Sequence, residues 1–187
     1  LRIPFSLPES PTQLLNKNFN QVEKAVYIGR ISPQKNLHNL ILAYGLLKKR
    51  RTPHLQPLVF FGKEDHLGSP NMGIKETSYL NFLRDLVEKL GLQDNISFYG
   101  QADRTTLNNY LTTHACLLVS PSLHSDENFG MAVLQALLLG NQVLISDWGG
   151  HSDFKKTFFE RVGLMPVTNT GFGPSLAAEV IAEQLEP

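Results

Sequence analysis

The chain has 187 residues, of which 42% are hydrophobic and 18% are charged, which suits one compact domain with a sizeable core. Its 17 Lys and Arg residues balance its 17 Asp and Glu residues, so no general attraction to nucleic acid or to an anionic membrane is expected. No apolar run approaches the roughly 20 residues that cross a bilayer, and the single cysteine excludes an internal disulfide.

The first 20 residues form a proline-rich stretch without hydrophobic periodicity, with Pro4, Pro8 and Pro11. We interpret residues 1–20 as a linker cut from something longer, and residues 21–187 as the domain. No signal-peptide pattern opens the chain, and Cys116 lies in an apolar run typical of a buried thiol. We therefore expect a cytoplasmic location.

Beyond the linker, β-prone apolar runs alternate with apolar residues at helical spacing. Strands that are apolar throughout and separated by helices imply a parallel sheet covered on both faces and joined by right-handed crossovers. We predict a doubly wound, Rossmann-like α/β fold of about six strands, whose ligands bind at the carboxyl ends of the strands. The expected strands are 25–28, 58–61, 95–99, 116–120, 142–146 and 163–167, and the expected helices are 37–47, 79–90, one capped by Asp103, and 129–139.

The segment 29–35 leaves the first expected strand with two cations, Arg30 and Lys35, and no acid. An Arg fork, a compact Lys charge and a following helix start could together neutralise a pyrophosphate. The structural alternative is a pair of surface charges that flank a helix. Neither the dinucleotide-binding nor the P-loop glycine motif occurs at the required place, which argues against dehydrogenases and P-loop NTPases.

The segment 121–130 precedes a nearly all-apolar helix and contains Asp126, Glu127 and Gly130. A glycine here lets the backbone approach a ligand closely, and the N–H groups of a first helical turn suit hydroxyl or phosphate oxygens. The acids have a structural alternative as helix caps. A further run, 146–153, offers two glycines for a tight turn after the fifth strand.

Together these runs resemble the carboxyl-terminal lobe of the retaining GT-B glycosyltransferases, the family that includes sucrose synthases and many bacterial mannosyl- and glucosyltransferases. The similarity covers about Ala25 to Asp153 and consists of motifs in the family's order and approximate spacing. They are Gly29-Arg30 with Lys35, Phe98-Tyr99-Gly100, Pro121-Ser122, Glu127-Asn128-Phe129-Gly130 and Gly149-Gly150.

The resemblance implies a hexosyltransferase in which Arg30 and Lys35 hold the diphosphate of a nucleotide-sugar donor and assist its departure, while Glu127 contacts the sugar. These three residues are the predicted catalytic set. The resemblance also places the acceptor on a separate amino-terminal lobe, so the chain alone should be inactive. The predicted donor site comprises Gly29, Arg30, Lys35, Gly62, Tyr99, Gly100, Glu127, Phe129, Gly130, Met131 and Gln135.

The six histidines show no pair at metal-binding spacing and there is no cysteine cluster, so we predict no metal site and no cofactor besides the donor substrate. We likewise expect no nucleic-acid partner and no transmembrane segment. The base, the sugar, the acceptor and a peripheral membrane location of the full-length enzyme stay open.

One position departs from the family, which usually has a second acid eight residues after the first, where this chain has Gln135. The family's second acid is understood to bind ribose hydroxyls, and a glutamine still accepts a hydrogen bond there, so weaker donor binding is expected. Eight helical residues rise about 12 Å, too far for positions 127 and 135 to flank one bond as glycosidase carboxylates do. Gln135 and the unusual segment 171–174 motivate one alternative, a degenerate non-catalytic module. A nucleotide-sugar epimerase lobe is the other.

Overall fold

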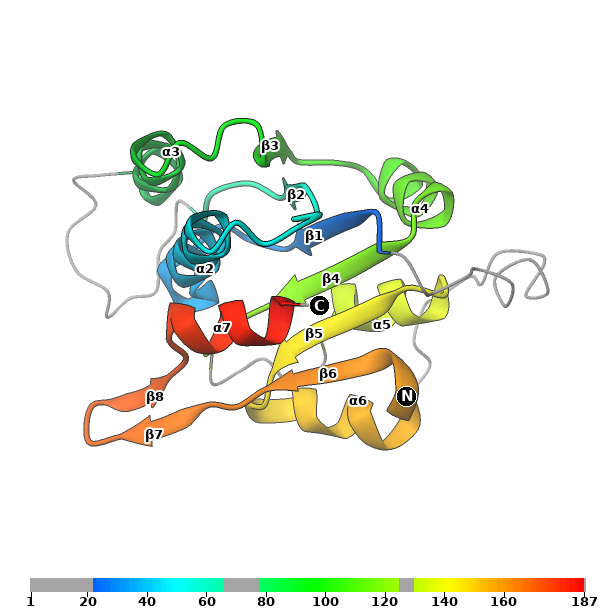
Figure 1. Cartoon of the computed structure of the whole chain (residues 1–187). Coiled ribbons are helices and arrows are strands. Elements are labelled where there is room, and N and C mark those ends of the chain that lie inside the picture. Colours follow the sequence, from blue (N-terminus) through cyan, green and yellow to red (C-terminus); the bar gives the residue numbers. More distant parts are fainter. Residues whose placement is uncertain (1–21, 66–77, 125–129, 187) are drawn as a thin grey trace.

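A single six-stranded sheet forms the centre of the molecule. The computed structural model describes residues 22–65, 78–124 and 130–186. Every neighbouring pair of strands is parallel, in the order β3-β2-β1-β4-β5-β6 (Figure 1). The strands are β1 (Lys24–Ile28), β2 (Leu58–Phe61), β3 (Ile96–Gly100), β4 (Cys116–Ser120), β5 (Gln142–Ser146) and β6 (Val162–Met165).

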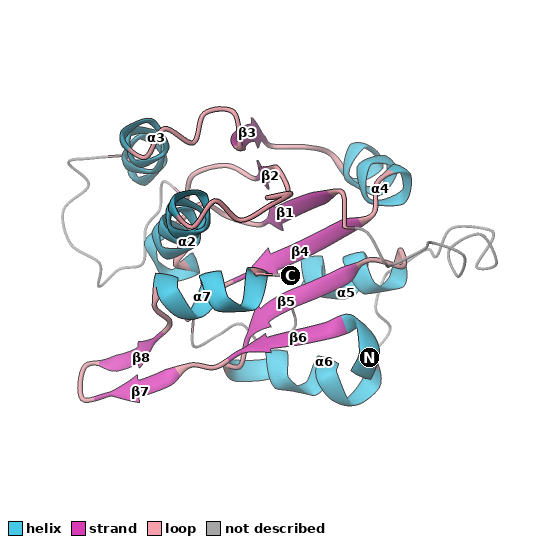
Figure 2. Ribbon diagram, viewed as in Figure 1, coloured by secondary structure: helices cyan, strands magenta, loops and turns pink. Residues whose placement is uncertain are grey.

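Helices cover both faces of this sheet, as the continuous apolar strands require (Figure 2). Successive side chains of β1 illustrate the division, since Ala25 and Tyr27 enter the core under α2, α3 and α7, and Val26 enters the core under α4 and α5. The predicted doubly wound fold is confirmed. The helices are α2 (Leu37–Lys49), α3 (Tyr79–Lys89), α4 (Arg104–Thr113), α5 (Met131–Leu138), α6 (Ser152–Thr157) and α7 (Ala178–Leu185), with short 3-10 turns η1 (Pro33–Lys35), η2 (Gly149–His151) and η3 (Phe159–Arg161).

Two helix starts show one case in which local sequence signals predicted the structure and one in which they did not. Asp103 caps α4 as predicted, because its Oδ1 accepts a hydrogen bond from Thr106 N at 2.7 Å, which also lowers the pKa of the Asp103 carboxyl. The expected start of a helix at Phe129 is wrong: the helix begins at Met131. Gly130 precedes it with a left-handed φ of 43° and cannot belong to the helix.

The strand order reverses direction between β1 and β4, which lie side by side at the centre of the sheet. In doubly wound sheets the loops that follow such a pair diverge to opposite faces and leave a crevice at the carboxyl edge. The loops that leave β1 and β4 are therefore the ones to examine. Among the described residues no helix is long and apolar enough to cross a membrane.

The carboxyl-terminal segment covers the same face of the sheet as α2. An antiparallel hairpin of β7 (Thr168–Thr170) and β8 (Gly173–Ser175) projects from the body, and its turn contains the fully exposed Phe172 (Figure 1). Helix α7 then packs against α2, and Asn36 Nδ2 just before α2 donates to Leu176 O at 2.9 Å. The unusual 171–174 segment thus forms the turn of this hairpin and the first two residues of β8.

Candidate functional site

The chain segments that leave β1, β2 and β3 are in direct backbone contact. Gly29 N donates to Phe61 O at 3.0 Å, and Gly62 N donates to Gly100 O at 2.8 Å. A Cβ atom on Gly62 would lie 1.8 Å from Gly29 O. Glycine at position 62 is therefore required by the close approach of two main chains, whatever ligand lies above them.

Arg30 lies just beyond this contact and is paired with an acid. Its Nη1 is 2.6 Å from Asp65 Oδ2, and the side chains are 60% and 15% exposed. Backbone hydrogen bonds from Ile31 N to Lys63 O and from Asp65 N to Ile31 O hold the two loops side by side. The segment 29–35 itself contains no acid, as the sequence shows, and the acid that pairs with Arg30 comes from the loop after β2.

Such a partly exposed ion pair is worth only about 0–1 kcal/mol. A phosphate group carries more charge than one carboxylate and fits the same planar fork, so it competes well for the guanidinium. Only one of the five N–H donors of Arg30 is needed for the contact with Asp65. The pair therefore holds Arg30 at the edge of the site without blocking it.

Lys35 links the loop after β1 to the loop after β4. It ends η1, and its Nζ donates to the hydroxyl of the buried Ser122 at 3.3 Å. Leu123 N donates to Gln34 O at 3.1 Å between the same loops. The structure thus places Lys35 across the switch point of the sheet, where a ligand is expected.

A buried hydrogen-bond network lies behind Ser122. The Ser146 hydroxyl, at the end of β5, donates to Ser122 O at 2.5 Å, and His151 Nδ1 of η2 is 3.2 Å from the same hydroxyl. Ser146 and His151 are both fully buried. Sequence reasoning interpreted this region only as a glycine turn and missed the network, since neither residue belongs to a motif.

The start of α5 is the next part of the predicted site. Gly130 is in tight contact with α6, because a Cβ atom there would lie 3.1 Å from Phe154 Cε2. Met131 follows as the first helical residue and is 47% exposed. Glu127 and Phe129, which carry the predicted sugar contacts, lie outside the described residues.

Tyr99 and Gln135 lie toward α4. The ring of Tyr99 is 57% exposed and packs against Phe61, with 4.8 Å between the centroids. Gln135 Nε2 donates to Asn108 Oδ1 of α4 at 2.6 Å. The partner Asn108 was not predicted, because nothing in the sequence indicates which residues of α4 face α5.

Metal ligands do not gather in the part of the chain that the structure describes, where no three His, Cys, Asp or Glu residues are grouped to hold an ion. The described site therefore offers two cations, close-packed glycines and a helix start.

Residues 15–166 match the family model described as "Glycosyl transferases group 1". The chain belongs to the group 1 glycosyltransferases. Among curated members it is 29% identical over 148 residues to mannosylfructose-phosphate synthase of Agrobacterium fabrum, covering 78% of this chain and 30% of that protein. It is 31% identical over 131 residues to GDP-Man:Man(3)GlcNAc(2)-PP-Dol alpha-1,2-mannosyltransferase of Mus musculus, covering 67% of this chain and 24% of that protein.

This glycosyltransferase chain spans 24–30% of the length of the curated relatives that it matches. Among solved structures, Anabaena HepE in complex with UDP superposes with a TM-score of 0.65 at 20% identity, over 94% of this chain and 42% of HepE. Sucrose-phosphate synthase of Thermosynechococcus elongatus gives 0.64 at 24% identity, over 94% and 38%. The separately solved C-terminal domain of the group 1 protein LpcC of Francisella tularensis gives 0.61 at 21% identity, over 95% and 81%. The fold is that of one lobe of a GT-B glycosyltransferase.

Proposed function

We propose that the chain is the donor-binding lobe of a retaining hexosyltransferase, which moves a sugar from a nucleoside diphosphate to an acceptor held by an amino-terminal lobe. The observation that carries this proposal is the position of Lys35. It bridges to Ser122 across the switch point, and Arg30 lies in the same loop after β1. UDP and UDP-glucose in the HepE structures support a nucleotide-sugar ligand for this fold.

In this proposal the diphosphate lies over the loop 29–35, between Arg30 and Lys35. Negative charge builds up on the diphosphate as the bond from sugar to oxygen breaks, and two fixed cations stabilise it at that moment. Glu127 contacts the sugar. The two cations replace the metal ion that would otherwise neutralise a diphosphate, so no metal is required.

A Lys35→Met variant tests the proposal. A hydrogen bond to a charged group contributes about 1.5–3 kcal/mol, so the variant is expected to bind UDP or GDP about 10- to 100-fold more weakly than the parent chain. Binding of uridine or guanosine, which lack the diphosphate, should not change. Calorimetry with both nucleotides and both nucleosides measures the difference, and unchanged diphosphate affinity would contradict the proposal.

Arg50→Gln serves as a matched control for the loss of one positive charge. Arg50 lies at the opposite end of α2 and forms an exposed ion pair with Glu186, so its replacement should leave nucleotide affinity unchanged. In the same samples the isolated chain should bind donor without transferring sugar, because the acceptor lobe is absent. Turnover by the chain alone would count against a separate acceptor lobe.

The replacement Gln135→Glu separates donor binding from the second candidate function, a degenerate module. The contact between Gln135 and Asn108 favours that alternative, because it holds the Gln135 side chain against α4. If position 135 accepts a ribose hydroxyl, a carboxylate should strengthen nucleotide binding by about 1 kcal/mol, or about fivefold. Unchanged affinity by calorimetry supports the degenerate module. Gln184→Glu on the exposed face of α7 controls for the added charge.

A further inference from the structure

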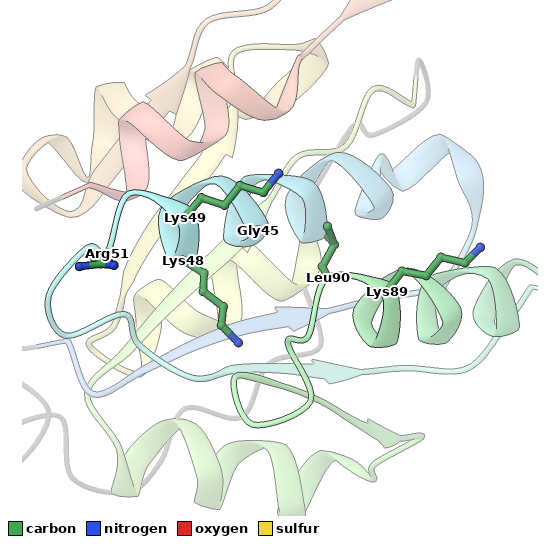
Figure 3. A pocket seen from close by; sticks show the side chains of 6 residues that line it. All are labelled: Gly45, Lys48, Lys49, Arg51, Lys89 and Leu90. Atoms are coloured by element: carbon green, nitrogen blue, oxygen red, sulfur yellow. The ribbon is translucent and has the colours of Figure 1, made fainter.

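A pocket of about 460 Å³ lies between the carboxyl-terminal ends of α2 and α3. Its lining consists of Gly45, Lys48, Lys49, Arg51, Lys89 and Leu90 (Figure 3). Helix α2 has 13 residues and so spans about 20 Å between Lys35 and this pocket. The pocket is therefore separate from the donor site, at the opposite edge of the sheet.

Every ionisable residue that lines the pocket is a cation. Lysines near helix ends have an ordinary structural role, since they offset the partial negative charge of the last carbonyls. Two helix ends supply only about one negative charge in total, however, at about half a charge each. Lys48 already serves this role by donating to Gly91 O, just beyond α3.

The other three cations are not compensated by the described part of the protein. The side chains of Lys49, Arg51 and Lys89 form no hydrogen bond or ion pair with any residue that the structure describes. The whole chain has equal numbers of acids and bases, so this gathering of charge is a local property of the fold. A concave site lined by uncompensated cations attracts anions.

Arg51 also occupies a backbone position that usually belongs to glycine. Thr52 N donates to Leu47 O at 3.1 Å and Arg51 N donates to Lys48 O at 3.0 Å, which is the hydrogen-bond pattern of a Schellman motif. Arg51 has the left-handed φ of 54° that this motif requires. The chain thus carries an arginine at the edge of the pocket where glycine would be less strained.

We propose that this pocket binds a ligand with two or more phosphate groups, either a free polyphosphate compound or the phosphorylated headgroup of a lipid. The volume lies in the range of small-molecule sites, about 300–1,000 Å³. In Figure 3 the three lysine side chains extend in different directions, so a ligand that contacts all three requires them to reorient. Binding is accordingly weakened by salt, because the charges are solvent-exposed.

Calorimetry with inorganic tripolyphosphate tests the pocket in a chain that also carries Arg30→Gln and Lys35→Met, so that the donor site does not contribute. Each charge lost from the pocket should reduce affinity about three- to tenfold in dilute buffer. The informative variant is Arg51→Gly, which removes one cation and relieves the left-handed strain. It should bind tripolyphosphate more weakly while its Tm rises by about 2–4 °C.

Lys49→Gln with Lys89→Gln should weaken binding further, and Lys156→Gln on α6, 78% exposed and outside the pocket, controls for net charge. Flotation with phosphatidylcholine vesicles, with and without phosphatidylinositol bisphosphate, whose headgroup carries more than one phosphate, distinguishes the two sources. If the acidic vesicles capture the parent chain but not the pocket variants, the ligand is a lipid headgroup. If the chain binds tripolyphosphate but not the vesicles, the ligand is a free compound. If neither probe binds, or if the pocket variants bind as well as the Lys156→Gln control, the proposal is overturned.

Discussion

Gly62→Ala is expected to lower the free energy of unfolding by about 3–5 kcal/mol, the range of severe single substitutions. The added Cβ would lie 1.8 Å from Gly29 O, and a φ of +151° is one that L side chains rarely adopt. The strands cannot separate to make room without losing the hydrogen bonds from Gly29 N to Phe61 O and from Gly62 N to Gly100 O. Thermal or urea unfolding followed by circular dichroism measures the effect.

Two further glycines separate the steric clash from the backbone strain. A Cβ atom on Gly100 meets nothing within 4 Å, but its φ is +88°, so Gly100→Ala should cost only about 1–3 kcal/mol. Gly171 has neither a positive φ nor a neighbour within 4 Å, and Gly171→Ala should be neutral or slightly stabilising. Equal losses for Gly62→Ala and Gly100→Ala would show that the close approach of the two loops is not important.

Asn141→Leu is expected to destabilise the fold by about 3 kcal/mol, since each buried polar partner that it removes costs about 1–3 kcal/mol. The side chain is 1% exposed and lies just before β5. Its Oδ1 accepts from Cys116 N at 3.0 Å, and its Nδ2 donates to Leu111 O at 2.9 Å and to Leu139 O at 3.4 Å. It therefore joins the end of α4, the start of β4 and the end of α5.

The same unfolding experiment checks this prediction, where a loss of about 3 kcal/mol corresponds to roughly 6–12 °C in Tm for a chain of this size. Asn109→Ala is the control, because the Asn109 side chain is exposed on α4 and forms no hydrogen bond with a described residue. A similar Tm for Asn141→Leu and Asn109→Ala would contradict the structural role of Asn141.

The periodic parts of the fold were predictable because their signals are local. Short apolar runs, separated by segments whose apolar residues recur at helical spacing, identified all six strands of the sheet. The continuous apolar character of these strands predicted helices on both faces. Asp103 was recognised as a cap because a capping side chain bonds a backbone N–H only three residues away. The end of the chain, with α6, the hairpin and α7, consists of short elements and was not predicted.

The candidate site was predicted in part. The sequence identified the loop that holds Arg30 and Lys35, because position after a parallel strand is enough to place a residue at the carboxyl edge. It did not identify Asp65, which pairs with Arg30, or Ser122 as the partner of Lys35. These partners are 35 and 87 residues away, and their pairing depends on the order of strands in the sheet.

By itself, then, the sequence determined which segments become the six strands of the sheet and the helices α2 to α5, and which loops carry charge toward the carboxyl edge. Only the tertiary structure decided which distant segments meet. It brings the main chain of Gly62 into close contact with that of Gly29, joins three elements through Asn141, and places lysines of two different helices in one pocket. The physical reason is the range of the interactions. Periodicity and capping act over a few residues, whereas side-chain partners and close backbone approaches depend on the packing of elements far apart in the chain.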